Sequence, residues 1–242
     1  MFLKIFKFKV YTGGLSRINL TSKTIINTIN PHSYITSKKD KLFFKSLLNS
    51  DYLFPDGIGI VIAAKVLYNK KIERITGAKI HEFLIDFANR RKLKVFYLGS
   101  SIDTLKKIEN NLSKDYPDID MKNFSPPFKK QLSDVDNEII FNKINDFGPD
   151  ILFVGMTAPK QEKWVFSNKK FISAKIICSI GAVFDFYAGT VQRAPKFLIF
   201  LGLEWAYRFI KQPVRLFRRN FISSPLFVFY LLIEKVKLVI FK

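Results

Sequence analysis

The residues best placed to do chemistry surround Asp56. An apolar run at residues 52–54 leads to this carboxylate, Gly57 and Gly59 follow it, and a small-residue apolar helix is expected at residues 58–67. The pattern places an acidic side chain at the carboxyl end of a strand, the edge at which open α/β sheets bind ligands. We therefore interpret Asp56 as a candidate general base. Because Asp before Gly is also a common turn former, the pattern alone leaves a structural role open.

Thr28 and Asn30 follow a second strand in the same way. Residues 24–28 are a short β-branched run that stops at Asn30 and Pro31, which is typical of a strand followed by a loop. Both polar residues are therefore expected at the carboxyl end of a strand, as Asp56 is. Asn-Pro is a favoured turn pair, so turn formation is the alternative role.

Two later strand ends also carry polar groups. One expected strand ends at Gly99 and Ser100, and a helix follows. Free backbone N–H groups at such a helix start can hold a phosphate or ribose, although one glycine does not make a dinucleotide-binding fingerprint. Another expected strand leads to a helix that begins at Pro159, with Gln161 and Glu162 in its first turn. We interpret these groups as candidate ligand-binding residues.

The elements that must position these residues alternate regularly. Five or six strand-then-helix units follow one another without long insertions. This predicts an α/β, Rossmann-like fold with a mostly parallel sheet and helices on both faces, so that the polar loops converge on one crevice. Residues 1–10 alternate Lys with Phe and Ile in the manner of one N-terminal strand, not of a signal peptide. We assign residues 1–190 to this catalytic domain.

The charge of the chain indicates a phosphate-bearing partner. Lys and Arg number 40 against 20 Asp and Glu, which gives a net charge of +20. Nucleic acid, an anionic membrane surface and a phosphorylated small molecule all fit this balance. One Cys and two His argue against a Cys/His zinc site. Asp118 and Asp120 have the spacing of a metal-binding pair but follow Tyr116-Pro117, so we interpret them as a solvated strand start and expect neither metal nor cofactor.

Residues 191–242 differ in composition and form an expected basic helical appendage. From residue 193 onward, ten Lys and Arg accompany two Glu, interleaved with aromatic and aliphatic side chains. Such a segment is typical of a membrane interface, where each cation near anionic lipid contributes about 1 kcal/mol. Its longest apolar run is far short of the roughly 20 residues that span a bilayer. A solvated helical hairpin is the alternative, and Arg193, Arg208 and Arg215 can instead hold a diphosphate.

Several separated motifs together resemble the WecG/TagA/CpsF glycosyltransferase family, over about residues 10–219. They are TINPHSY (28–34), PDGIG (55–59), ERITG (73–77), GMTAPKQE (155–162), GAVFDFYAG (181–189), RAP (193–195), GLEWAYR (202–208) and PVR (213–215). Each motif is weak alone, whereas their order and spacing together are specific.

The resemblance implies a function and roles for several residues. The family transfers N-acetylmannosamine, its uronic acid or a related sugar from UDP to an undecaprenyl-diphosphate-linked sugar at the cytoplasmic membrane face, with inversion and without a metal. By resemblance, Asp56 is the base and Thr28 a neighbouring polar residue. Arg74 is a cation near the substrate, and Gln161 and Glu162 belong to the pocket of the second half. The Arg-rich end corresponds to a membrane-associating appendage.

One departure, two alternative functions and one open question accompany this resemblance. The family commonly has Asp where this chain has Lys79, which bears on the local pocket and on donor or acceptor choice. Another nucleotide-sugar enzyme of similar fold is one alternative, because fold does not fix chemistry. A nucleic-acid-binding module fits the charge, but no RNA-binding signature is present and we expect no nucleic-acid partner. Assembly into a homo-oligomer is left open.

Overall fold

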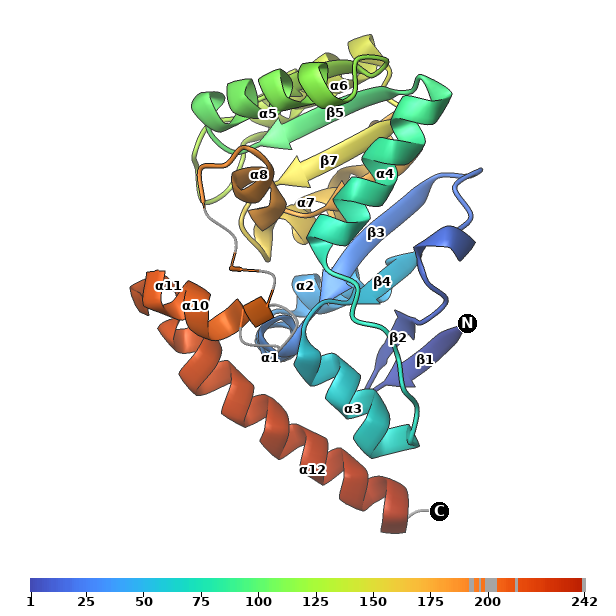
Figure 1. The fold of residues 1–242 in the computed structure, drawn as a ribbon, viewed down its shortest axis with the longest axis vertical. Coiled ribbons are helices and arrows are strands. Elements are labelled where there is room, and N and C mark those ends of the chain that lie inside the picture. Colours follow the sequence, from blue (N-terminus) through green and yellow to red (C-terminus); the bar gives the residue numbers. More distant parts are fainter. Residues whose placement is uncertain (192–193, 196, 199–203, 212, 241–242) are drawn as a thin grey trace.

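The computed structural model describes residues 1–191, 194–195, 197–198, 204–211 and 213–240 (Figure 1). Six parallel strands form one sheet in the order β4-β3-β8-β7-β5-β6. They are β3 (Thr24–Ile29), β4 (Tyr52–Pro55), β5 (Lys94–Gly99), β6 (Asp120–Phe124), β7 (Ile151–Gly155) and β8 (Ile176–Ser179). The predicted α/β fold with a mostly parallel sheet is confirmed.

Helices cover both faces of this sheet, with α4 in front and α7 behind in Figure 1. One face carries α4 (Gly77–Arg91), α5 (Ile102–Asp115) and α8 (Ala182–Tyr187), and the other carries α6 (Asp134–Phe147) and α7 (Lys160–Asn168). Residues alternate between the faces along each strand, so Ile26 of β3 packs in the cluster with Leu84 of α4, whereas Ile25 packs with Val165 of α7. Every residue of β7 and β8 is buried, as expected for strands covered on both sides.

A smaller core lies beside β4. The N-terminal residues form two antiparallel strands, β1 (Phe2–Ile5) and β2 (Phe8–Tyr11), so the prediction of a single strand is wrong. The chain reverses at Phe6, which has a φ of 54° and gives no glycine or proline turn signal. Three helices pack on this hairpin, namely α1 (Pro31–Lys39), α2 (Lys41–Leu48) and α3 (Ile58–Tyr68). Short 3-10 turns, η1 and η2, occupy Leu15–Arg17 and Lys169–Phe171.

The described C-terminal part is helical, as expected. It contains α10 (Glu204–Lys211), α11 (Pro213–Phe217), a π-helical turn at Arg218–Ser223 and α12 (Ser224–Ile240). Phe227 and Leu231 of α12 are buried in the same cluster as the hairpin, α1 and α3, and Figure 1 shows α12 running beside α3. None of the helices in the described ranges combines the length and the apolar character needed to cross a membrane.

Candidate active site

Asp56 lies in a tight turn between β4 and α3. Its backbone N–H donates to Ile29 O at 2.9 Å, which continues the pairing of β3 with β4 by one residue. Gly57 follows with a φ of 127°, a backbone conformation that residues other than glycine rarely adopt. A Cβ at Gly59 would lie 2.4 Å from Pro31 Cγ, so α3 approaches α1 too closely for a larger residue. The two glycines therefore fix the half-buried Asp56 at the carboxyl edge of the sheet.

Thr28, on β3, and Asn30, which directly follows that strand, lie beside this turn. Thr28 is aligned with Phe54, two residues before Asp56, and is half-buried. The position expected for a Cβ on Gly57 is 3.4 Å from Asn30 Cβ, which places Asn30 against the Asp56 turn. Asn30 Oδ1 accepts a hydrogen bond from the Ser33 backbone N–H at 3.0 Å and so caps α1. Its amide oxygen thus has a structural role, and substrate binding by Asn30 stays a prediction.

Arg74 is brought to the same edge by the segment before α4. The backbone N–H of Ile75 donates to Pro55 O at 3.0 Å, so residue 74 lies next to the end of β4. Lys79, in the first turn of α4, forms an exposed salt bridge of 3.0 Å with Glu73. Lys79 is therefore paired with a carboxylate of the segment before α4.

The turn at Gly99 also depends on glycine. Gly99 has a φ of 115°, and a Cβ there would lie 2.5 Å from Gly155 O of the neighbouring strand. The next backbone N–H, of Ser100, donates to Gly155 O at 3.1 Å, and the N–H of Thr104 donates to Ser101 Oγ at 3.1 Å. Two N–H groups of the predicted phosphate cradle are thus already used within the protein. Binding at Gly99 stays a prediction.

Gln161 and Glu162 are buried at the start of α7, each with 5% of its surface exposed. Gln161 Nε2 donates to Glu162 Oε1 at 2.9 Å, and Gln161 Oε1 accepts from the backbone N–H of Gly181 at 3.1 Å. Burial raises the pKa of Glu162 to about 7, while its backbone hydrogen bond and that from Gln161 oppose the rise. The pair therefore connects the loop after β7 to the turn after β8.

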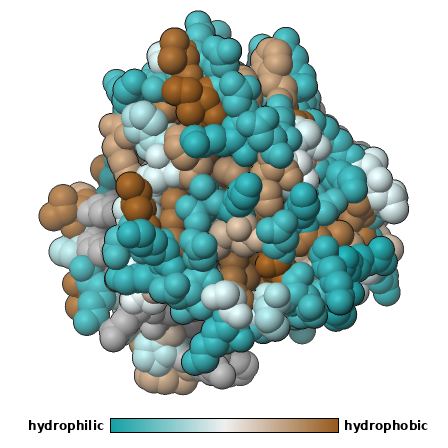
Figure 2. All heavy atoms as spheres, turned by 90° about the horizontal axis from the view of Figure 1, so that it is seen from above, coloured by the Kyte–Doolittle hydropathy of each residue, from teal (hydrophilic) through white to brown (hydrophobic). Residues whose placement is uncertain are grey.

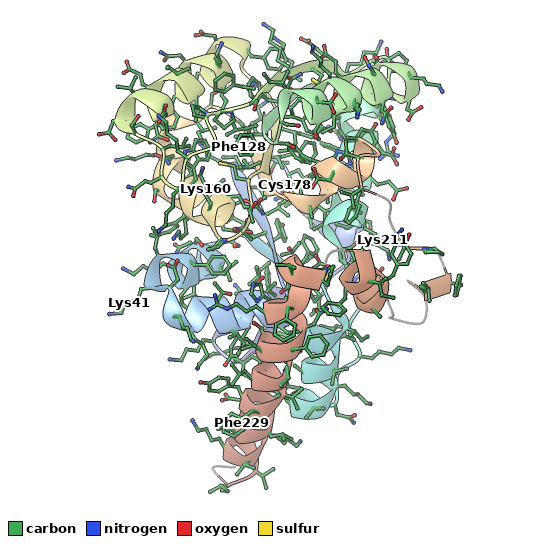
Figure 3. All side chains as sticks on the ribbon, turned by 90° about the vertical axis from the view of Figure 1, so that its left-hand side faces the viewer. Lys41, Phe128, Lys160, Cys178, Lys211 and Phe229 are labelled. Carbon is green, nitrogen blue, oxygen red and sulfur yellow. The ribbon has the colours of Figure 1, made fainter. Side chains whose placement is uncertain are left out.

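These turns stand in a row because their strands are adjacent and parallel. From β4 through β3, β8 and β7 to β5, the strand ends lead to Asp56, Asn30, Gly181, Gln161 and Gly99. Figure 3 views this edge, with Lys160 and Phe128 above and Phe229 of α12 below. The edge combines a carboxylate, a hydroxyl and helix starts, which suits proton removal beside an anionic leaving group.

The structure does not describe the side chains of the three arginines that we predicted to bind a diphosphate. Arg193 lies outside the described residues. Arg208 and Arg215 lie within α10 and α11, but their side chains fall outside the described part of the chain. Their predicted roles stay predictions.

Two features beside the edge escaped prediction. The loop after β6 is held over it by Ser125 Oγ, which donates to Ser100 O at 2.7 Å, and by Lys160 Nζ, which donates to Lys129 O at 2.6 Å. The pair Pro126-Pro127 was the sequence signal that could have indicated this loop.

His32 Nδ1 lies 2.8 Å from Ser223 Oγ, which ties the start of α1 to the π-helical turn. That contact joins residues 191 positions apart, and local sequence carries no signal for it.

A cavity of about 390 Å³ lies between α4 and η1 and is lined in part by Glu73 and Ile75, the neighbours of Arg74. Leu15 and Phe83 contribute apolar walls, and Glu73, Glu82 and Asp86 contribute carboxylates. Lys79 also lines the cavity and pairs with Glu73, so Glu82 and Asp86 leave its lining negatively charged, which does not suit a phosphate-bearing donor. In the described ranges, no group of three or more His, Cys, Asp or Glu side chains is arranged to hold a metal ion.

Comparison with known proteins gives a consistent result. Residues 11–239 match the sequence model of the "Glycosyl transferase WecG/TagA/CpsF family". A relative from Bacillus subtilis (strain 168) is 31% identical over 211 residues, which cover 87% of this chain and 80% of the relative. A second, from Bacillus spizizenii, is 29% identical and covers 84% and 76%. A third, from Staphylococcus aureus (strain MW2), is 27% identical and covers 90% and 83%. All three are named N-acetylglucosaminyldiphosphoundecaprenol N-acetyl-beta-D-mannosaminyltransferase.

Proposed function

The chain belongs to the WecG/TagA/CpsF glycosyltransferase family, and from this premise we propose that it transfers an N-acetylmannosamine-type sugar from UDP to a lipid-diphosphate-linked N-acetylglucosamine. The transferred sugar and the acceptor are proposed because the names of the three relatives contain both. The donor sugar is N-acetylmannosamine or its uronic acid, and UDP is the proposed carrier. The product is a precursor of a cell-surface polysaccharide or teichoic acid.

The proposed mechanism is a single displacement with inversion. Asp56 takes the proton of the acceptor hydroxyl, the acceptor oxygen bonds to the anomeric carbon, and the bond from that carbon to the UDP oxygen breaks. Negative charge grows on the departing diphosphate and needs fixed donors. Arg74 and the predicted arginines Arg193, Arg208 and Arg215 are the proposed cations, with Thr28 beside the reacting groups. No metal is required in this scheme.

Membrane association is proposed for the C-terminal appendage, residues 191–242. The outer side of α12 exposes Val228, Phe229, Leu232 and Val236 beside Lys235, while its inner side packs on the protein. Apolar side chains next to cations suit an interface with anionic lipid. We place the enzyme on the inner face of the cell membrane, where it meets a lipid-linked acceptor.

One experiment tests this function directly. The full chain is incubated with UDP-N-acetylmannosamine, its uronic acid or UDP-N-acetylglucosamine and a short-chain lipid-diphosphate N-acetylglucosamine, and the product mass is measured. We expect an added N-acetylmannosamine or uronic acid residue, with an undiminished yield when a chelator is present. Absence of product with every donor would overturn the proposed function, and loss of product with the chelator would overturn metal independence.

A further inference from the structure

The loop after β6, residues 125–133, presents an exposed aromatic side chain. Phe128 is 83% exposed, more than any other phenylalanine in the described residues. A single exposed apolar side chain is common on protein surfaces and by itself indicates no function. Phe128 differs from such a residue because the loop around it is fixed by contacts on both sides and lies over the row of turns.

The chain on either side of Phe128 is held in one conformation. Pro126 and Pro127 have restricted φ angles, and Pro126 is buried. The Lys129 backbone N–H donates to Pro127 O at 2.8 Å, which closes a three-residue turn with Phe128 at its apex. Leu132 is buried in the cluster that includes Val165 of α7 and so anchors the far end of the loop. The phenyl ring is therefore presented by a rigid turn.

Two hydrogen bonds hold this turn over the ends of β5 and β7. Ser125 Oγ donates to Ser100 O, in the turn after β5, at 2.7 Å. Lys160 Nζ, at the start of the helix after β7, donates to Lys129 O at 2.6 Å. Phe128 lies between these two anchored residues in the sequence, and Figure 3 shows it near Lys160. The ring therefore belongs to the carboxyl edge of the sheet, where open α/β sheets bind ligands.

The turn beneath the loop has a strained backbone. Ser100 has a φ of 60°, a left-handed conformation that is unfavourable for residues other than Gly, Asn and Asp. Its N–H donates to Gly155 O at 3.1 Å, and its carbonyl accepts from Ser125 Oγ, so both backbone groups are held in place. Residues in such conformations cluster at ligand-binding sites. A strained turn and a fixed, exposed ring thus occur at the same place on the edge.

The position along the row of turns identifies the chemical group that the ring would meet. Three inter-strand steps, β4-β3, β3-β8 and β8-β7, separate the end of β4 from the end of β7, which is about 14 Å at about 4.8 Å per step. This is comparable to the length of an extended sugar nucleotide. When its anomeric carbon lies at Asp56, its base lies at the far end, beyond the diphosphate and the ribose. Nucleobases are flat and stack readily on aromatic side chains.

We propose that Phe128 is the platform on which the uracil base of the UDP-sugar donor stacks. The turn at residues 127–129 presents the ring, and the diphosphate extends from the base back along the row toward Asp56. Phe128 contributes to donor affinity and takes no part in the chemical step. The identity of the base rests on the proposed function, whereas the exposure and the fixed position of the ring do not.

Two other occupants fit this position less well. The acceptor sugar can also pack on an aromatic ring, but its hydroxyl must reach Asp56, at the other end of the row. A lipid surface would have to meet Phe128 as well as the exposed apolar side of α12, and Figure 3 shows Phe128 and Phe229 of α12 far apart along the molecule. Both occupants are outcomes that the experiments can detect.

Calorimetric titration of the full chain with UDP and with inorganic diphosphate tests the proposal. Loss of a stacking platform weakens base binding by about fivefold or more. Phe128→Ala should raise the Kd of UDP by that factor and leave the Kd of diphosphate unchanged, whereas Phe128→Tyr should bind UDP within about twofold of wild type. Phe171→Ala is the matched control, since Phe171 is 49% exposed in η2, before the start of β8, and it should change neither Kd.

Two further measurements separate direct stacking from an indirect effect on the loop. In the transfer assay, Phe128→Ala should raise KM for the UDP-sugar and leave kcat and the acceptor KM nearly unchanged. In Phe128→Trp, UDP should quench more indole fluorescence than it does in wild type, because a stacked base quenches an indole.

Several outcomes would overturn the proposal. They are equal UDP affinity of Phe128→Ala and wild type, a change in the acceptor KM alone, and weaker vesicle binding by Phe128→Ala with unchanged UDP affinity. The last two would assign the ring to the acceptor sugar or to a lipid surface. If wild type binds no UDP, the proposed donor fails together with the platform. If wild type and Phe128→Ala use the UDP-sugar equally well, only the platform fails.

Discussion

The Asp56 carboxylate can be altered with its turn intact, because the backbone N–H of residue 56, held by Ile29 O at 2.9 Å, fixes the turn. Asp56→Asn keeps the size of the side chain and removes its basicity. A lost general base lowers the rate by about 100-fold to 10,000-fold. We therefore expect sugar transfer to fall by at least about 100-fold while UDP still binds, measured by product formation and by calorimetry.

A matched control lies at the other end of the same strand. Asp51 Oδ2 accepts from the Ile25 backbone N–H at 2.7 Å, and the amide oxygen of Asp51→Asn can keep that bond. This variant should transfer sugar at nearly the wild-type rate. Near-normal turnover by Asp56→Asn would exclude Asp56 as the base.

Gly99 tests how closely the backbones of β5 and β7 approach each other at the row of turns. A Cβ there would lie 2.5 Å from Gly155 O, at a φ of 115°. Gly99→Ala should therefore lower the free energy of unfolding by more than the roughly 1–3 kcal/mol of backbone strain alone. Gly14→Ala is the control, since Gly14 has a φ of 77° but no atom within 4 Å of the added Cβ. Chemical denaturation measures both, and equal stability of Gly99→Ala and wild type would contradict the close approach of β5 and β7.

Residue types predicted location better than they predicted contacts. Two glycines after Asp56 and a β-branched run leading to Thr28 were enough to put both at the carboxyl edge of the sheet. The hydrogen bonds of Asn30 and the burial of Glu162 could not be predicted in that way. Asn30 caps α1, and Glu162 is buried because Gln161, Gly181 and the strands surround it. These contacts join elements far apart in sequence, so local pattern does not report them.

At the scale of elements, α12 packs on the N-terminal half of the chain. Phe227 is 2% exposed, and its ring lies 5.6 Å from Phe6 and 5.5 Å from Tyr34, whereas Phe229 is 57% exposed. Phe227→Ala should lower the free energy of unfolding by about 3–5 kcal/mol. Phe229→Ala should change it by no more than about 0.5 kcal/mol. Thermal or chemical unfolding of the two variants measures the difference, and similar losses would contradict the docked position of α12.

The alternation of strands and helices predicted the sheet, because the spacing of apolar residues within each strand and each helix is visible in the local sequence. The hairpin at β1 and β2 was missed, since Phe6 turns without a typical turn residue. The packing of α12 was missed for another reason. Its residues 225–233 are all apolar, so the sequence marks no single apolar side there, and the packing against α1 and α3 decides which side is buried. The division at residue 190 therefore stays a prediction about composition, while the smaller core includes both ends of the chain.

At the scale of the whole molecule, hydrophobic exposure is unevenly distributed. Figure 2, which views the end that carries α5 and α6, shows a mainly hydrophilic surface with scattered apolar residues. The opposite end carries α12, whose exposed side includes Phe229, Leu232, Val236 and Val239. A net charge of +20 attracts any polyanion, but a clustered apolar surface beside cations favours lipid over nucleic acid.

Two exposed valines at opposite ends separate a membrane-binding surface from general charge attraction. Val236 on α12 is 54% exposed and lies between Lys235 and Lys237, whereas Val135 on α6 is 66% exposed. Val236→Glu removes an apolar contact and places a carboxylate near anionic lipid, so binding to vesicles rich in phosphatidylglycerol should weaken by about tenfold or more. Val135→Glu makes the same change in net charge and should leave vesicle binding nearly unchanged. Cosedimentation at two salt concentrations measures both variants. Because attraction by net charge depends on the total, equal weakening by the two substitutions would show that α12 is not the surface that meets the membrane.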